Sequence, residues 1–241
     1  MSKVYADKIE PRDSSMDVTI GTSTNTITLA GNDLRANTVK DAGGNTLWTS
    51  DGSGNLSSVN SALAGNLILL STQTASGSSS LSFTTLIDST YDVYIFKFYD
   101  INPATDTVLF QFNVSTDGGS NYNVTKTTSF FYSYHFESDA YSGLGYITGS
   151  DLAQSTSYQQ LMRDVGNGSD ECGTGELYLF NPASTTYVKQ FYARTETYEA
   201  RSSIEECYSA GYGNTTSAIN AISFKMSSGN FDGIIKMYGL L

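Results

Sequence analysis

Residues 90–100 of the chain read TYDVYIFKFYD, and this stretch decides the fold class. Every second residue is aromatic, so one face of an extended segment carries three rings: Tyr94, Phe96 and Phe98. The run DTVLFQFNVS at 106–115 alternates in the same way and collects apolar side chains on one face: Val108, Phe110, Phe112 and Val114. Because a period of two residues is the period of a β-strand, both segments are predicted to be core strands of a sheet.

Working outward, similar runs rich in aromatic and β-branched residues recur through the rest of the chain, at 66–72, 80–87, 129–136, 175–181, 186–194, 217–226 and 231–239. Polar turns separate them, so the sequence predicts an all-β fold, a jelly-roll-like antiparallel β-sandwich over residues 65–241. One segment, DLAQSTSYQQLMRD at 151–164, is predicted to be a short helix with Asp151 as its N-cap.

Residues 1–64 have a different composition, with few aromatic residues and many Gly, Asn and Asp spacers. Short apolar pairs recur at intervals of about 8 to 11 residues, which is typical of small strands. Such strands carry too few apolar residues to enclose a core alone, so residues 21–64 are predicted to form a β-stem in which three identical copies of the chain wind round one axis. A disordered Gly/Ser/Asn-rich arm is the alternative, and residues 1–20 form a separate leading segment.

The charge balance narrows the choice of partner. The chain of 241 residues has 13 Lys and Arg against 24 Asp and Glu, a net charge of -11, so binding to nucleic acid is not expected. No apolar run reaches the roughly 18 residues needed to cross a bilayer, and the first residues do not read as a signal peptide, so no membrane insertion is expected.

Few residues suit catalysis or metal binding. His135 is the single histidine, which argues against a histidine-rich zinc site, and no cofactor is expected. Cys172 and Cys207 are interpreted as free thiols, with a single disulfide as the alternative. Glu205 and Glu206 are adjacent, so they point to opposite faces of a strand and are expected to be solvated. The sequence therefore predicts a protein that is not an enzyme and holds no metal.

The stretch STDGGSNY at 115–122 resembles the Asp-box of propeller glycosidases. It occurs once, with no repeat at a propeller period, so a catalytic role is not expected. We interpret Asp117 as a turn residue whose carboxylate binds nearby backbone amides, within a hairpin connection.

The tyrosines of FFYSYHFESDAYSGLGY at 130–146 are the candidate binding residues. This segment is predicted to be a strand followed by a long loop rich in Gly and Asp. Rigid amphipathic rings beside adaptable polar residues suit recognition of a glycan or a protein surface, which selects Tyr132, Tyr134, Tyr141 and Tyr146. The alternative is that these rings fill the sandwich core or a contact between chains.

Two stretches resemble fibre-type virion structural proteins of tailed bacteriophages, particularly those of marine bacteria. They are ADKIEPRDSSMDVTIGTSTNTITLAGNDLRANTVKDAGGNTLWTSDGSGNLSSVNSAL at 6–63 and AINAISFKMSSGNFDGIIKMYGLL at 218–241. The resemblance implies a homotrimeric appendage, assembled in the host cytoplasm and located in the virion. It implies docking on the tail or capsid by residues 1–20, for which Tyr5, Ile9 and Pro11 are the candidate anchors.

The expected function is that of a homotrimeric tail fibre that attaches the particle to the host surface. Its expected partners are further copies of itself, other virion proteins, and a host-surface glycan or protein. The alternative is a capsid decoration protein, a head fibre or a tail adaptor with no receptor-binding role.

Overall fold

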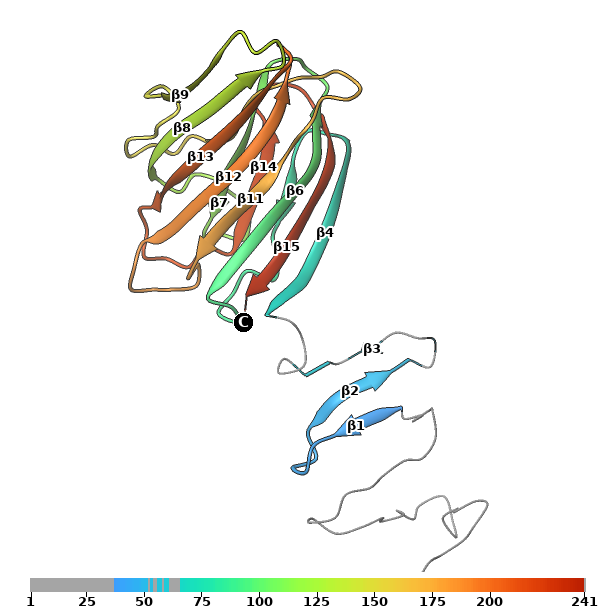
Figure 1. The fold of residues 1–241 in the computed structure, drawn as a ribbon. Coiled ribbons are helices and arrows are strands. Elements are labelled where there is room, and N and C mark those ends of the chain that lie inside the picture. The colour runs from blue at the N-terminus through green and yellow to red at the C-terminus, as the bar shows by residue number, and fades with distance from the viewer. Residues whose placement is uncertain (1–36, 52, 54–55, 58, 61–65, 241) are drawn as a thin grey trace, which may run out of the picture. The chain divides into compact units, whose positions relative to one another are not determined.

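The computed structural model describes residues 37–51, 53, 56–57, 59–60 and 66–240. Contacts divide the chain into two units, Met1–Asn60 and Ser61–Leu241. The predicted docking residues Tyr5, Ile9 and Pro11 lie outside the described residues. Residues 21–36 of the predicted stem lie outside them as well. All regular structure in the described residues is β-strand, which confirms the all-β prediction (Figure 1). Accordingly, these residues contain no helix that could span a membrane.

The N-terminal unit holds a small antiparallel sheet of three strands in the order β1-β2-β3. The strands are β1 (Thr38–Lys40), β2 (Thr46–Ser50) and β3 (Leu56–Ser57). The turn between β1 and β2 is fastened by Asp41, whose Oδ1 accepts a hydrogen bond of 2.8 Å from the backbone N–H of Asn45. Gly44 adopts a φ of 82° in this turn, a conformation that glycine reaches without steric cost.

The C-terminal unit is one large antiparallel sheet that bends back on itself and nearly closes into a barrel. Its longer arm has the order β4-β15-β6-β11-β12-β13-β8-β9 and its shorter arm the order β10-β7-β14-β5. In that order, the longer arm comprises Leu67–Ser78, Phe231–Leu240, Val93–Pro103, Gly173–Phe180, Lys189–Glu199, Ser203–Gly213, Lys126–Phe136 and Ser142–Tyr146. The shorter arm comprises Gln159–Val165, Val108–Ser115, Ala221–Met226 and Leu81–Phe83.

The two arms are joined at one side where β10 pairs with β12, Val165 facing Glu199. At the other side the edge strands β4 and β5 are linked by a side chain, since Gln73 Nε2 donates to the carbonyl of Ser82 at 2.9 Å. The sheet therefore has an inner face, enclosed between the arms, and an outer face.

Aromatic rings from the two arms form the core between them. Phe98 of β6 lies 5.3 Å from Phe110 of β7, and Phe112 of β7 lies 4.9 Å from Phe191 of β12, measured between ring centroids. Such edge-to-face ring pairs add to the stabilisation from burial. The faces predicted from the alternation of 90–100 and 106–115 are confirmed, because all seven predicted side chains are buried.

The predicted helix at 151–164 is wrong. Residues 159–165 form strand β10, which pairs with β7 so that Gln159 faces Phe112. Both Gln159 and Gln160 are buried, and Thr128 Oγ1 donates to Gln159 Oε1 at 2.5 Å. Tertiary contacts override local helix propensity here, because an extended segment completes the shorter arm and satisfies the backbone of β7.

Asp117 is a turn residue, as interpreted from the sequence. Its Oδ1 accepts hydrogen bonds from Ser115 Oγ at 2.6 Å and from the backbone N–H of Asn121 at 2.9 Å. These bonds lower the pKa of Asp117 to about 2, the bond from Ser115 first. The predicted hairpin connection is wrong, because β7 belongs to the shorter arm and β8 to the longer one, and these two strands do not pair. The turn instead carries the chain from one arm to the other.

Both cysteines are free thiols, Cys172 half-buried and Cys207 buried. Burial raises the pKa of Cys207 to about 12, so its thiol stays protonated at neutral pH.

Two fully buried lysines flank Gly213 on the inner face. Lys126 of β8 and Lys189 of β12 both pair with this residue of β13 in register. Lys126 Nζ donates to Asn113 Oδ1 at 2.5 Å and to the carbonyl of Val124 at 2.9 Å. Burial lowers the pKa of Lys126 to about 7 and also lowers the pKa of Lys189, since neither amine has a carboxylate partner among the described contacts.

Candidate functional site

The predicted binding tyrosines of β8 lie on the inner face of the sheet. The alternation that buries Phe130 places Tyr132, Tyr134 and Phe136 on the same face. The rings of Tyr132 and Tyr134 are stacked, with centroids 5.7 Å apart and planes inclined by 22°. Tyr134 and Phe136 meet edge to face at 6.0 Å.

Two glycines of the edge strand β9 make room for these rings. Gly145 pairs with Tyr132 and Gly143 pairs with Tyr134. A Cβ atom at Gly145 would lie 2.7 Å from Tyr132 Cε1, and one at Gly143 would lie 3.0 Å from Tyr134 Cε1. The tyrosine rings therefore lie across β9, against backbone that carries no side chain.

The other two predicted tyrosines have different positions. Tyr141 meets Phe136 edge to face at 5.6 Å and extends the row of rings. We call Tyr132, Tyr134, Phe136 and Tyr141 the aromatic wall. Tyr146 pairs with Phe131, which places it on the outer face, where its hydroxyl donates to Asp151 Oδ2. The structure thus brings three of the four predicted tyrosines together and separates Tyr146 from them.

The aromatic wall lines a groove of about 230 Å³ together with Arg163, Arg201 and Glu205. Pockets that enclose a whole drug-sized ligand usually measure about 300 to 1,000 Å³. The groove therefore suits one unit of a longer ligand.

Strand β10 contributes two adjacent charged residues to one side of the groove. In a regular strand, neighbours point to opposite faces, but β10 is bulged and Asp164 adopts a φ of 47°. Arg163 Nη2 therefore reaches Asp164 Oδ2 at 3.0 Å, while Arg163 Nη1 donates to Glu205 Oε1 at 3.1 Å. The Arg163 guanidinium also lies 4.6 Å from the centroid of Tyr132, within cation–π range.

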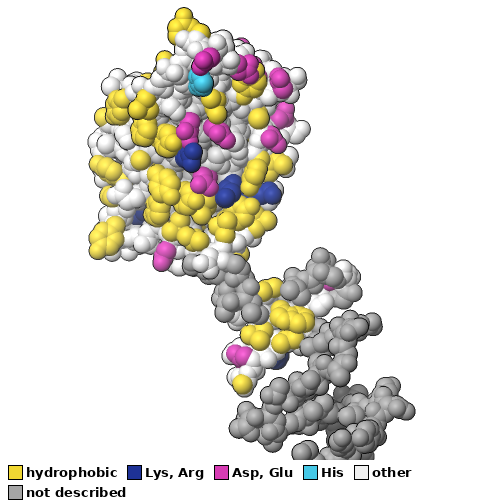
Figure 2. Space-filling model, in the orientation of Figure 1, with side chains coloured by type: hydrophobic (Ala, Val, Ile, Leu, Met, Phe, Trp, Pro, Cys, Tyr) yellow, Lys and Arg dark blue, Asp and Glu magenta, His cyan; other side chains and the backbone are white. Residues whose placement is uncertain are grey.

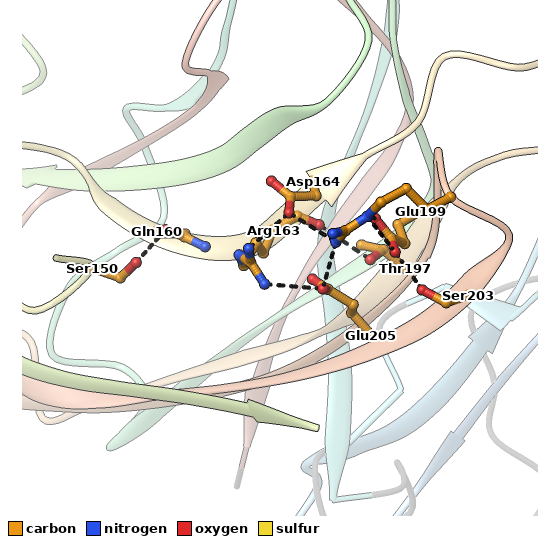
Figure 3. A network of polar contacts seen from close by, with 9 residues as sticks. Ser150, Gln160, Arg163, Asp164, Thr197, Glu199, Ser203 and Glu205 are labelled. Atoms are coloured by element: carbon orange, nitrogen blue, oxygen red, sulfur yellow. Dashed lines mark hydrogen bonds and ion pairs between the residues drawn. The ribbon is translucent and has the colours of Figure 1, made fainter. Parts of the chain in front are cut away.

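The turn between β12 and β13 contributes a second arginine, Arg201. Figure 3 shows the neighbouring polar contacts, with Arg163 beside Glu205 and Ser203 beside Glu199. Arg201 Nε donates to Glu199 Oε2 at 2.8 Å, and Arg201 Nη2 lies 3.5 Å from Glu205 Oε1. Ser203 Oγ donates to the same Glu199 carboxylate. The guanidinium of Arg201 lies 5.8 Å from the ring centroid of Phe136. We call Arg163, Asp164, Glu199, Arg201 and Glu205 the charge network.

Glu205 is the residue of the charge network whose bonding is incomplete. Its side chain is 1% exposed, and Oε2 is buried without a hydrogen-bond partner although Oε1 binds Arg163. Burial raises the pKa of Glu205 to about 7, against the opposing effect of Arg163. The expectation that Glu205 is solvated is therefore wrong. Glu206 lies on the outer face, where it pairs with Arg194.

The carboxylate oxygens of Asp164, Glu199 and Glu205 lie within 4.8 Å of one another, a spacing that a metal ion could bridge. The guanidinium groups of Arg163 and Arg201 already bind these oxygens and supply the positive charge that a cation would bring. We therefore assign no metal to the charge network.

Two larger hollows, of about 360 and 580 Å³, include outer-face residues such as Arg194 and Ile204, and the second also borders Phe136 of the aromatic wall. Figure 2 shows many apolar side chains on the C-terminal unit in the view of Figure 1. Charged side chains of the outer face pair with each other, as Lys97 does with Glu176 at 3.5 Å. Neither hollow is lined by a described buried polar atom that lacks a partner. The inner groove is therefore the candidate site.

Sequence reasoning missed Arg163, Asp164, Glu199 and Arg201. The first two lie in the segment predicted as a helix, and the other two lie at a turn whose position could not be inferred from alternation. Comparison with protein-family models, with curated proteins and with solved structures found no significant match. What the groove binds is therefore inferred from its own geometry.

Proposed function

We propose that this chain is a virion structural protein of a tailed bacteriophage, a homotrimeric fibre whose C-terminal unit attaches the particle to a glycan on the host surface. The single observation that carries the binding role is the aromatic wall beside the charge network. A tyrosine ring offers an apolar face to the C–H groups of a sugar and a hydroxyl to its polar groups. Arginine and carboxylate groups beside the rings offer further hydrogen bonds.

The place in the virion is supported by the resemblance of residues 6–63 and 218–241 to fibre-type virion proteins. On this proposal the C-terminal unit is a jelly-roll-like sandwich, residues 21–64 form the trimeric stem, and residues 1–20 dock on another virion protein through Tyr5, Ile9 and Pro11. The protein is assembled in the host cytoplasm and has no membrane-inserted or nucleic-acid-bound form.

The groove favours binding over catalysis. Glycoside hydrolysis requires two carboxyl groups that flank the bond to be broken. Among the described carboxylates, Glu205 alone lines the groove; Asp164 and Glu199 are not among its lining residues, and Arg201 engages both of them. The protein therefore acts without a chemical step, a cofactor or a metal.

A second candidate is a capsid decoration protein, a head fibre or a tail adaptor with no receptor. The outer face favours it, because Phe131, Tyr192 and Leu144 are 40%, 45% and 74% exposed there. Exposed apolar residues that gather on one face are typical of a surface covered by another protein. An antibody against the C-terminal unit separates the two candidates, since it blocks adsorption to host cells only if this unit binds the receptor.

The binding role is tested with the full chain on an array of bacterial envelope oligosaccharides. Replacing Tyr134 by Ala should weaken binding about tenfold or more, because a ring of the aromatic wall is removed. Tyr187→Ala is the matched control, since Tyr187 is 72% exposed and lies outside the groove. Equal affinities of the two variants, or no binding by the wild type, would contradict the proposal. Light scattering should give a mass near three times 26.0 kDa for the trimer.

A further inference from the structure

The groove offers a ligand one buried hydrogen-bonding atom that the protein leaves unused, Glu205 Oε2. The other charged groups of the charge network are engaged by each other, as the contacts of Arg163 and Arg201 with Glu205, Glu199 and Asp164 show. A buried oxygen without a partner carries a desolvation penalty, which a ligand that bonds to it would remove. The ligand is therefore expected to present a hydrogen-bonding group at this point.

The net charge of the charge network determines which charge the ligand's hydrogen-bonding group can carry. Three carboxylates face two guanidinium groups, so the network carries a net charge of -1 when all five are ionised. An acidic ligand would meet this surplus of negative charge, and a bond that drew Arg163 or Arg201 toward the ligand would leave a carboxylate that is 1% exposed without its partner. Leaving a buried carboxylate unpaired costs more than an exposed ion pair gains. The groove therefore opposes a carboxylated or phosphorylated sugar.

A hydroxyl fits Glu205 Oε2 in both of its protonation states. Because burial raises the pKa of Glu205 to about 7, the group is protonated in a large share of molecules near neutral pH. A hydroxyl can donate to the carboxylate form and accept from the acid form, whereas an ammonium group can only donate. The other groups near Glu205 do not change this, since the guanidinium groups stay charged and the raised pKa of Cys207, about 12, keeps that thiol neutral.

We propose that the groove selects an uncharged saccharide over an acidic one, with a sugar hydroxyl bonded to Glu205 Oε2 and a C–H face of the sugar on the rings of Tyr132 and Tyr134. This inference rests on the proposed glycan binding and adds the class of sugar. It names Glu205 as the residue that sets the preference.

The test uses matched pairs of oligosaccharides that differ only in a carboxyl group, such as galacto- and galacturono-oligosaccharides, or gluco- and glucurono-oligosaccharides. Calorimetry with the full chain at pH 8 should give an affinity about tenfold or more higher for the neutral member of the pair that binds. Equal or tighter binding of the acidic member would overturn the inference while leaving glycan binding intact. Failure of every sugar of both classes to bind would overturn the proposed function itself.

Two further measurements locate the preference at Glu205. Glu205→Gln should narrow the difference between neutral and acidic sugars, while Glu206→Gln, the adjacent residue on the outer face, should leave it unchanged. Should Glu205→Gln not fold, the wild type supplies the same information through pH. Lowering the pH from 8 to 5.5 should strengthen binding of the acidic sugar and leave that of the neutral one constant, because Glu205 becomes protonated and its negative charge is removed from the groove. A preference that neither the variant nor the pH changes would overturn the role of Glu205.

Discussion

The inner and outer faces of β8 and β13 carry similar residues and differ in how their polar groups are satisfied. Both have stacked rings, Tyr132 with Tyr134 inside and Phe131 with Tyr208 outside. Both have an arginine beside a glutamate, Arg163 with Glu205 inside and Arg194 with Glu206 outside. Only the inner pair leaves a buried oxygen without a partner. An abundance of tyrosine is therefore common to both faces, whereas the unmet hydrogen-bonding capacity beside the rings distinguishes the candidate site.

The largest expected effect comes from removing the inner arginine. Arg163→Ala leaves Glu205 with only the longer contact to Arg201, so the free energy of unfolding should fall by about 3 kcal/mol at pH 8. The outer-face variant Arg194→Ala should cost much less, because the Arg194 side chain is 65% exposed. Urea unfolding of both variants measures the difference, and equal losses would mean that the two ion pairs are equivalent. At pH 5 the loss in Arg163→Ala should shrink, since Glu205 is then protonated.

A second test follows stability with pH. Folded Glu205 keeps its proton up to about pH 7, while the unfolded chain releases it near the ordinary pKa of 4.5. The folded state therefore binds more protons between these values, and this group makes stability fall as pH rises through the window. Between pH 5 and 7.5 the fall should be about 2 kcal/mol, and Glu205→Gln should remove it.

The shifted pKa of Lys126 changes stability with pH in the direction opposite to that of Glu205. It therefore provides an internal check on the pH profile of stability. Its folded pKa of about 7 lies below the ordinary 10.5, so between these values the unfolded chain binds the extra proton. Stability from this group should therefore rise as pH increases from 7 to 10. A Glu205→Gln profile that still falls between pH 5 and 7.5 would show that another group is responsible for the fall.

A smaller effect should follow from filling the space beside the inner rings. Gly145→Ala places a Cβ atom against Tyr132, so the ring must shift, at a cost of about 1 kcal/mol in unfolding free energy. Saccharide affinity should drop more clearly than stability, because the aromatic wall is displaced. Gly149→Ala is the control, since nothing lies within 4 Å of its added Cβ. Equal saccharide affinities of the two glycine variants would show that the aromatic wall does not take part in binding.

The smallest effect is expected on the outer face. Tyr192→Ser removes a ring that is 45% exposed and stacks on Tyr178 at 4.7 Å. Stability should change by less than about 1 kcal/mol and saccharide affinity should not change, as titration calorimetry can establish. A loss of saccharide affinity in Tyr192→Ser would indicate that the binding site lies on the outer face.

The core of the C-terminal unit was predictable from the sequence because its strands bury a row of residues with a period of two. Phe96, Phe98 and Phe110 follow this rule, although Ile95, which precedes Phe96, is buried as well. Strand β10 breaks it, since its buried positions include Gln159 and Gln160 and its two bulges disturb the alternation. Strand β13 was not among the predicted core strands, although Glu205 and Glu206 were placed on a strand, because its buried positions are small or polar, as with Ser203, Glu205 and Ser209.

The candidate site was predictable only in part, for a related reason. Alternation along β8 places Tyr132 and Tyr134 together, whatever the rest of the chain does. The charge network depends on the register between β10, β12 and β13, which are separated by turns and bulges. No local pattern specifies that Arg163 meets Glu205 across these strands.

The buried amines of Lys126 and Lys189 can be used to measure how often the folded C-terminal unit opens. Amine-directed reagents need a solvent-exposed, uncharged nitrogen, and both lysines are inaccessible while the sheet is closed. The remaining lysines of residues 37–51 and 66–240 are at least partly exposed and should react in the folded protein. Labelling of Lys126 and Lys189 therefore counts unfolding events, and a peptide map over time would measure how often the interior of this protein opens.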